Sequence, residues 1–496
     1  MHAAHLPVGR SMNAEPRTGP AKTLASALAR DIEAEIVRRG WAVGESLGSE
    51  PALQQRFGVS RSVLREAVRL VEHHQVARMR RGPNGGLYIC EPDAGPATRA
   101  VVIYLEYLGT TLADLLNARL VLEPLAASLA AERIDEAGIA RLRAVLHAEQ
   151  QWRPGLPMPR DEFHIALAEQ SKNPVLQLFI KVLMRLTTRY ALQSRTDSET
   201  EALEAVDHLH THHSRIVAAV TAGDPARAKT LSERHVEAVT AWLQRHHAGD
   251  RNRGRTPRRP LNSEVPQGKL AEMLAATIGD DIAADGWRVG SVFGTETALL
   301  QRYRVSRAVF REAVRLLEYH SIAHMRRGPG GGLVIAEPAA QASIDTIALY
   351  LQYRDPSRED LRCVRDAIEI DNVAKVVKRL AEPQVAAFVA SRRSGLPDDS
   401  RQTPDDVRRA IAEEFDFHVG LAQLAGNAPL DLFLRIIVEL FRRHWSSTGQ
   451  ALPTWSDVRA VHHAHLRIAD AVAAGDLSVA SYRLRRHLDA AASWWL

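Results

Sequence analysis

The sequence contains few cysteines, no long apolar run and no sign of a targeting segment. Only two cysteines, Cys90 and Cys363, occur in 496 residues, and neither belongs to a pair with metal-ligand spacing, so a disulfide framework is excluded. No apolar run approaches the ~18 residues that a membrane span needs. Residues 1–21 lack the apolar core of a signal peptide and are expected to be a disordered tail. These absences predict a cytoplasmic protein with no membrane partner.

Positive charge is concentrated in two short stretches. The net charge of +5 is modest for this length. Between Arg56 and Arg81, however, there are seven arginines and two acidic residues, and Arg302 to Arg327 has the same composition. Such clustering within an otherwise balanced chain indicates surfaces that bind a polyanion.

The two basic stretches are copies of one module. Residues 56–89 recur as residues 302–335, and 23 of the 34 positions are identical. An internal repeat this close means that the same structural unit is used twice.

Helix and strand signals within the module predict a winged helix-turn-helix. A helix is expected over Lys22–Gly40 and another from about Glu50, ended by Gly58. Ser60 is a natural N-cap for a third helix over Arg61–His74. Two strands, at 77–81 and 87–89, flank the turn GPNGG.

The rest of the chain predicts amphipathic helices, so the fold class is mainly α. The expected order is a tail (1–21), a winged helix-turn-helix (22–92), a helical domain (96–247), a charged linker (248–262), a second winged helix-turn-helix (263–338) and a second helical domain (343–496). The linker, with five arginines, either stays solvated or touches DNA phosphate.

Each third helix carries donors where a recognition helix meets base edges, at its N-terminal end. The arginines of the hairpin turn are suited to phosphate. A single arginine is most simply a solvated helix residue, but seven in one module argue for DNA. The predicted contacts are Ser60, Arg61, Ser62, Arg65, Arg80, Arg81 and Gly85, and then Ser306, Arg307, Arg311, Arg326, Arg327 and Gly331.

The segments VSRSVLREAVRLVE and RMRRGPNGG resemble the winged helix of the GntR family of bacterial transcriptional regulators. The resemblance implies a double-stranded DNA operator. Pro51 and Thr297 stand where that family usually has an arginine, which implies an altered operator contact.

Histidines recur with the same spacing in both helical regions. His164 and His418 lie in the related segments FHIALAEQSKN and FHVGLAQLAGN, and His235 follows His213 by 22 residues, as His487 follows His465. A helical hairpin can bring such pairs to one level, so three histidines from three helices predict a divalent-metal site in each region.

The helical regions resemble the FCD effector domain of the FadR subfamily. That resemblance implies a zinc, nickel or manganese-class ion held by Asp-x3-His and two later histidines. Here Glu414 precedes His418 by four residues, whereas Arg160 has that place in the first region, with Asp161 beside it. The predicted ligands, favoured in the second set, are Asp161, His164, His213 and His235, and then Glu414, His418, His465 and His487.

The resemblance also implies an arginine that binds a small carboxylate effector. Arg119 and Arg365 occupy that place. Each has a glutamate four residues later, so an ordinary ion pair on a helix surface is an equally weighted alternative.

These observations predict a transcriptional regulator that is not an enzyme, with repression as the default expectation. Its two halves are expected to form an intramolecular pseudo-dimer on an asymmetric operator, with further homo-oligomers left open. Two alternatives remain: an architectural DNA-binding protein with degenerate sensor domains, and a metal-dependent enzyme.

Overall fold

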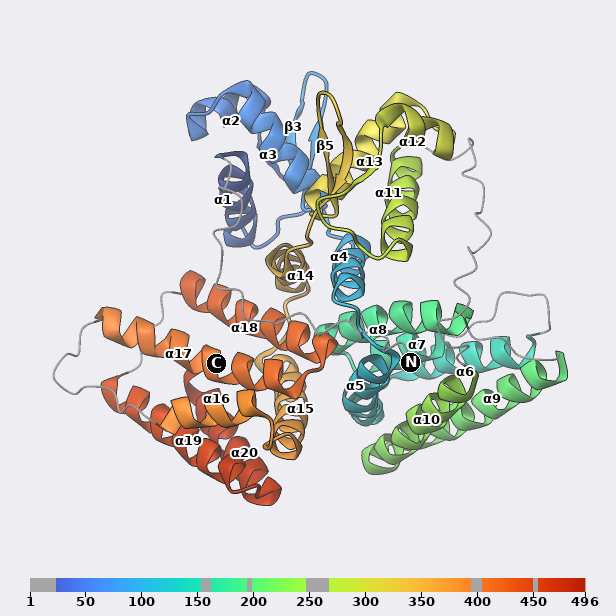
Figure 1. Ribbon diagram of the computed structural model, residues 1–496, viewed down its shortest axis with the longest axis vertical. Helices are drawn as coiled ribbons and strands as arrows, with labels where there is room; N and C mark the ends of the chain where they lie inside the picture. The colour runs from blue at the N-terminus through green and yellow to red at the C-terminus, as the bar shows by residue number, and fades with distance from the viewer. Residues whose placement is uncertain are drawn as a thin grey trace, which may run out of the picture. The chain divides into compact units, whose positions relative to one another are not determined.

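The computed structural model describes residues 24–152, 162–193, 199–246, 267–393, 404–448 and 454–495. The predicted tail, the linker 248–262 and Asp161 lie outside these residues. Within them the chain forms twenty α-helices and six short strands (Figure 1). The fold is therefore mainly α, as predicted. The chain divides into two compact units, residues 1–93 and residues 94–496.

The first unit is a winged helix-turn-helix, made of α1 (Leu24–Arg38), β1 (Ser46–Gly48), α2 (Glu50–Phe57), α3 (Arg61–His73), β2 (Ala77–Arg80) and β3 (Gly86–Ile89). Gly58 ends α2 in the left-handed conformation at φ 63°, which costs glycine little. The Ser60 side chain accepts a hydrogen bond from the Val63 amide and so begins α3. The predicted two-stranded wing was incomplete, because the three-residue strand β1 adds to β3 and makes a three-stranded sheet.

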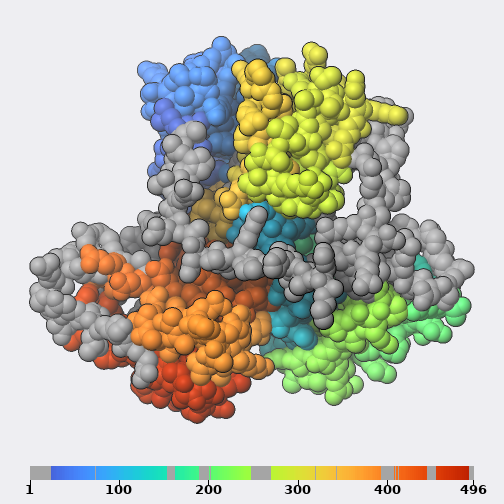
Figure 2. All heavy atoms as spheres, viewed as in Figure 1, coloured from blue at the N-terminus to red at the C-terminus, as the bar shows by residue number. Residues whose placement is uncertain are grey.

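The second winged helix has the same order of elements: α11 (Gln267–Ala284), β4 (Val292–Gly294), α12 (Glu296–Tyr303), α13 (Arg307–Tyr319), β5 (Ala323–Arg326) and β6 (Gly332–Ile335). Its sheet order, β4-β6-β5, matches that of the first. Apolar side chains of α11 and α13, among them Ile278 and Phe310, form its core. Atoms of this domain form one continuous body in the space-filling view (Figure 2).

Helices make up the remaining described residues. In the first half of the chain they are α4 (Ala94–Tyr107), α5 (Leu112–Arg133), α6 (Glu136–Gln150), α7 (Glu162–Gln170), α8 (Pro174–Gln193), α9 (Glu199–Thr221) and α10 (Pro225–His246). In the second half they are α14 (Ala340–Arg354), α15 (Arg358–Lys378), α16 (Pro383–Arg393), α17 (Pro404–Ala425), α18 (Ala428–Thr448), α19 (Trp455–Ala473) and α20 (Leu477–Trp495).

Each half contains the helical hairpin that the sequence predicts. Between α9 and α10, Gly223 has φ 66° and the Asp224 carboxylate accepts a hydrogen bond from the Arg227 amide at 3.0 Å. Between α19 and α20, Asp476 accepts one from the Val479 amide at 2.9 Å. These caps set the register of each hairpin and hence the level at which its histidines meet.

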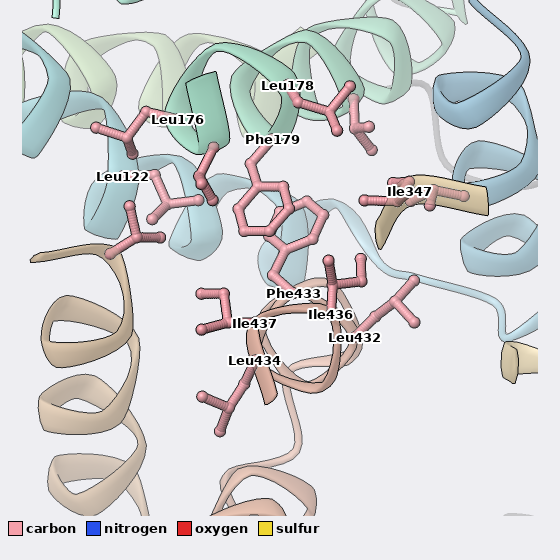
Figure 3. Packing of buried hydrophobic residues seen from close by; sticks show 14 of the residues in the cluster. Leu122, Leu176, Leu178, Phe179, Ile347, Leu432, Phe433, Leu434, Ile436 and Ile437 are labelled. Atoms are coloured by element: carbon pink, nitrogen blue, oxygen red, sulfur yellow. The ribbon is translucent and has the colours of Figure 1, made fainter. Parts of the chain in front are cut away.

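The two helical regions share one hydrophobic core. Phe179 of α8 stacks on Phe433 of α18 with ring centroids 4.0 Å apart, and Leu122 and Ile347 belong to the same cluster (Figure 3). This continuity across helices far apart in the sequence explains why residues 94–496 form one compact unit.

Hydrogen bonds between the two regions are reciprocal. The Asn173 side chain donates to the Asp360 carbonyl at 2.9 Å, and the Asn427 side chain donates to the Asp114 carbonyl at 2.9 Å. Each asparagine also accepts backbone amides at the start of its own helix, α8 or α18. The two regions therefore meet through equivalent surfaces, in the manner of an isologous dimer contact.

Helix α4, in the first half, packs against the second winged helix. The Tyr107 ring lies 5.5 Å from the Trp287 ring in a T-shaped arrangement, and its hydroxyl donates to Glu337 at 2.8 Å. The second winged helix therefore rests on a helix that leads directly into α5 of the first half.

Replacing Asn173 tests the contact between the two helical regions. We expect Asn173→Ala to lower the free energy of unfolding by about 1–3 kcal/mol, because a helix cap and a buried hydrogen bond are both lost. Asn173→Asp keeps the capping acceptor but removes the donor to the Asp360 carbonyl and to Cys363 Sγ and adds a buried charge, so it tests the contact with the second region separately from the cap. Urea unfolding measures both, and an unchanged stability in both variants would contradict the contact.

Candidate DNA-binding surface and metal centre

In the first winged helix, the predicted DNA contacts on α3 lie together and are exposed. Ser60, Arg61, Ser62 and Arg65 are all solvent-accessible at or near the N-terminus of α3. Arg61 and Arg65 each donate through Nε to the same Glu50 oxygen, at 2.9 and 2.8 Å. These hydrogen bonds, with that from Arg61 the largest cause, lower the pKa of Glu50. Glu50 therefore holds both guanidinium groups side by side at the N-terminal end of α3. This is the end that a recognition helix presents to base edges.

The second winged helix presents the same side chains with a looser clamp. Ser306 caps α13, and Arg307 and Arg311 are exposed on its first turns. Arg311 Nε lies 3.7 Å from a Glu296 oxygen. The weaker ion pair leaves this arginine less constrained than Arg65.

The two wings carry exposed arginines on a tight hairpin. The Arg80 guanidinium lies 4.3 Å from the centre of the Tyr88 ring, and Arg326 donates to the Gly330 carbonyl at 2.9 Å. Arg81 and Arg327 are also exposed. The hairpin itself needs glycine at 85 and 331, because a Cβ there would lie 2.8 Å from the Arg80 carbonyl oxygen and 2.3 Å from that of Arg326.

Two arginines of the basic stretches pair with an acidic residue of the first helix of their own domain. Arg56 pairs with Glu35 of α1 at 2.7 Å, and Arg302 pairs with Asp281 of α11 at 2.8 Å. These two arginines hold helices together, which the sequence count of seven did not distinguish.

In the second half, four predicted metal ligands meet in the protein interior. His418 Nε2 and His465 Nε2 lie 3.1 and 3.2 Å from His487 Nε2. The Glu414 carboxylate lies 3.5–3.6 Å from the same three nitrogens. Both oxygens of Glu414 are buried without a hydrogen-bond partner. A carboxylate in that state is costly unless a cation faces it, so the residues fit a bound divalent ion.

Residues behind the ligands fix their orientation. His418 Nδ1 contacts Glu369, which accepts a hydrogen bond from Arg365 Nε at 2.5 Å. Burial would raise the pKa of Glu369, but Arg365 and His418 lower it to about 2. The ring of His465 stacks on Phe417 at 4.0 Å. A carboxylate behind an imidazole is the usual support of a metal-bound histidine.

In the first half, the structure brings together the three predicted histidines. His213 Nε2 lies 3.4 Å from His235 Nε2, and the His164 ring centroid lies 5.1 Å from that of His235. One ligand atom from each lies within 4.8 Å of the others. Burial lowers the pKa of His213 and of His235 well below the usual value, which keeps both neutral, as metal ligands must be.

Two glutamates support this first cluster from behind. Glu123 contacts His164 Nδ1 at 2.9 Å and accepts from Arg119 Nε at 2.5 Å. Burial opposes ionisation of Glu123, yet Arg119 and His164 bring its pKa well below the usual range. Glu149 of α6 contacts His213 Nδ1 at 2.8 Å, and burial raises the pKa of Glu149 to about 8.

The two arginines that the family resemblance implies for effector binding, Arg119 and Arg365, lie beside the clusters. Arg119 is 1 % exposed and Arg365 is 5 % exposed. The i,i+4 ion pairs with Glu123 and Glu369 that the alternative expected are present, but they are buried and do not lie on a helix surface. Arg119 Nη2 lies 3.4 Å from His164 Nε2, and Arg365 Nη2 is buried without a hydrogen-bond partner.

A cavity of about 490 Å³ opens onto the first cluster. Its walls include Arg119 and the three clustered histidines, together with Trp242 and His212. This volume lies within the range of roughly 300–1,000 Å³ typical of small-molecule sites. A small ligand can therefore reach the histidine nitrogens of the first half.

Some functional residues gave no usable signal in the sequence. Glu149 lies 64 residues from His213, and no motif connects them. Glu50 and Glu296 begin their helices and were not assigned a role. The sequence does not indicate that Glu123 and Glu369 also contact a histidine, because each lies four residues after an arginine and is explained by that pair alone.

Within the described residues, no helix combines the length and the apolar character that a membrane span requires.

Comparison with known proteins agrees with these features. The model of the FCD domain matches residues 114–238 and 360–490, more than half of the chain, and that of the bacterial regulatory proteins of the gntR family matches residues 24–86. The HTH-type transcriptional regulator LutR of Bacillus subtilis is 29% identical over 199 residues, which are 40% of this chain and 90% of LutR. The Exu regulon transcriptional regulator of Escherichia coli is 27% identical over 231 residues, 45% of this chain and 85% of that protein.

The similarity to solved structures is weak and does not bear on the family. The Streptococcus agalactiae GntR structure aligns with a TM-score of 0.31 at 21% identity, covering 44% of this chain and 99% of that one. The family matches rest on the sequence, with two FCD regions that fill the helical parts of both halves. The chain therefore belongs to the GntR family of bacterial regulatory proteins with FCD domains, and it is a DNA-binding transcriptional regulator.

Proposed function

We propose that this regulator reads an operator with two covalently linked winged helices and that a metal-dependent carboxylate sensor controls the binding. The proposal uses the domain bounds predicted from the sequence: winged helices at 22–92 and 263–338, sensors at 96–247 and 343–496, and a linker at 248–262. Repression in the cytoplasm, relieved by the effector, is the simplest mode. The observation that carries the sensor proposal is the buried Glu414 carboxylate, whose oxygens face three histidine nitrogens at 3.5–3.6 Å and form no hydrogen bond.

A divalent ion of the zinc, nickel or manganese class suits the donors. Imidazole nitrogens with one carboxylate bind such ions readily. Glu414, His418, His465 and His487 would hold it in the second half, and His164, His213 and His235 in the first. Bound metal would supply a Lewis-acidic partner for an anion.

A small carboxylate is the effector class that the neighbouring charges support. The unpaired Nη2 of Arg365 is a buried donor, and such a donor costs free energy until it meets an acceptor. A carboxylate bound at the metal would be within reach of this guanidinium, which can donate to both of its oxygens. Arg119 is the corresponding group in the first half.

The pairing of the two halves supports action as an intramolecular pseudo-dimer. The reciprocal bonds of Asn173 and Asn427 and the shared core are the contacts that two separate chains would otherwise make. The recognition helices differ at Ser62 and Ala308, so we propose an asymmetric operator.

Contacts of α4 provide a route from sensor to DNA. Arg119 and Glu123 lie on α5, which follows α4, and α4 supports the second winged helix through Tyr107. A ligand that favours one position of α5 would thereby favour one position of this domain, which is the differential contact that allostery requires.

Gel-shift titration tests the proposal. The operator is first identified by selection from random DNA, and binding is then measured with apo protein, with Ni²⁺, and with Ni²⁺ and a panel of small carboxylates. We expect at least one metal-and-carboxylate condition to change the affinity about 5–150-fold. Equal affinities in all conditions, with metal bound, would overturn the sensor assignment.

Arg365→Lys tests the effector-binding role directly. We expect the carboxylate concentration for a half-maximal effect to rise about 10–100-fold, because lysine keeps the charge but loses the paired donors. Arg358→Lys, at the exposed start of the same helix, is the matched control. Metal content is measured on the same samples, and an unshifted midpoint would contradict the role.

A further inference from the structure

The two histidine clusters have three histidines in equivalent positions but differ in the fourth ligand. In the second half, Glu414 approaches all three histidines from one turn before His418. In the first half, the residue four positions before His164 is Arg160, which cannot bind a metal ion. The negative charge that Glu414 supplies is therefore not supplied from the corresponding position of the first half.

The nearby arginines make this difference larger. Arg119 Nη2 lies 3.4 Å from His164 Nε2, one of the nitrogens that would face the ion. Glu123 is the one carboxylate that pairs with this guanidinium among the described residues, so the positive charge beside the ion is less compensated than in the second half. In the second half, Arg365 donates to Glu369 at 2.5 Å, and Glu414 adds a second carboxylate to the same cluster.

Glu149 does not take the place of Glu414. It contacts Nδ1 of His213, whereas Nε2 of that ring faces His235. The two nitrogens lie on opposite sides of the imidazole, so Glu149 supports the ring from behind. The first cluster is thus positioned by two glutamates, Glu123 and Glu149, but receives no carboxylate on its Nε2 side from the described residues.

A cavity beside the first histidine cluster has room for an external carboxylate. The cavity of about 490 Å³ has Arg119, His164, His213 and His235 in its wall. An anion that enters it meets the guanidinium and the histidine cluster together. A carboxylate placed there would act as Glu414 does: it would ligate the ion and add a second negative charge beside the arginine, which already pairs with Glu123.

We propose that in the first half the carboxylate effector itself completes the metal site. Metal alone and carboxylate alone then bind there weakly, and each raises the affinity of the site for the other. The second half, by contrast, binds its ion with its own four residues. The inference rests on the proposed metal-binding function. Its consequence is that the second site is filled whenever metal is present, while the first is filled only when metal and effector are present together. One chain then has a second-half metal site that is always filled and a first-half metal site that is filled only with effector.

Calorimetric titration with Ni²⁺ tests this, with acetate as the simplest carboxylate probe and chloride at equal ionic strength as control. We expect two classes of site. One is already tight in chloride, and the other is weak in chloride and is tightened by acetate about 5–150-fold more than the first. His235→Ala should remove only the class that is weak in chloride and His487→Ala only the class that is tight in chloride. The class that remains shows that each variant is folded.

Glu414→Ala converts the second site into a likeness of the first. We expect its Ni²⁺ affinity to fall in chloride and to recover at least tenfold in acetate. Failure of acetate to restore it would contradict the claim that an external carboxylate can replace Glu414.

Asp161→Asn tests the alternative that Asp161, and not an external carboxylate, is the fourth ligand in the first half. If this change abolishes metal binding in the first half in chloride as well as in acetate, Asp161 is the fourth ligand and the inference is wrong. If both sites bind Ni²⁺ with affinities that acetate does not alter, the inference also fails, while the metal-binding function stands. If neither site binds a metal ion, the proposed metal-binding function fails.

Discussion

A chain carrying both Arg61→Ala and Arg307→Ala is expected to bind its operator more weakly by about 2–6 kcal/mol, roughly 30-fold to 10⁴-fold. Each arginine stands at the exposed N-terminus of a recognition helix, where a bidentate contact to a base contributes about 1–3 kcal/mol. The two helices lie on separate domains without shared partners, so the two losses should add. Gel-shift titration at fixed salt measures the effect.

A control of equal charge distinguishes base recognition from general attraction. Arg143→Ala with Arg485→Ala removes the same charge from exposed positions in the helical regions. We expect this pair to change operator affinity by less than about 0.5 kcal/mol at 150 mM salt, where the Debye length is about 8 Å. The recognition-helix pair should also lose discrimination between operator and random DNA. Equal losses in both pairs would show that α3 and α13 do not read bases.

His487→Ala is expected to weaken metal binding in the second half by about 2.5–4 kcal/mol. This figure is one quarter of the 10–16 kcal/mol typical of a four-ligand structural zinc site. His487 Nε2 lies 3.1 and 3.2 Å from its two neighbouring histidine nitrogens, so its loss opens the centre of the cluster. Zn²⁺ at 100 times the wild-type dissociation constant should stabilise the wild type by about 2.7 kcal/mol and this variant far less.

The quantity to compare is the shift in melting temperature on adding metal, because the cavity left by alanine lowers stability by itself. His463→Ala changes an exposed histidine on α19, the helix that carries His465, and serves as the control. It should retain the full shift. An unchanged shift in His487→Ala would remove His487 from the metal centre.

The sequence predicted those parts of the fold that local chemistry determines. Gly58 and Ser60 predicted where α2 ends and α3 begins, because a left-handed glycine and a capping hydroxyl act within a few residues. The repeated 22-residue spacing of histidines predicted clusters, because Gly-Asp caps fix each helical hairpin. Strand β1 was missed because three residues carry too little periodic signal.

Contacts between distant segments could not be predicted in the same way. The stacking of Phe179 on Phe433 and the bond from Tyr107 to Glu337 join helices hundreds of residues apart. Nothing near either residue in the sequence indicates its partner. The sequence also does not predict that Arg119 and Glu123 are buried. Their burial places this ion pair beside the histidine cluster and not on an exposed helix face.

The central claim is that one chain supplies both DNA-binding domains of a complete operator complex. Light scattering coupled to size-exclusion chromatography, on protein bound to a DNA fragment carrying one selected operator, tests it most directly. We predict a protein mass of one chain, 54.8 kDa, for each DNA molecule at nanomolar concentration. A complex with two chains for each operator and none with one chain would contradict the claim.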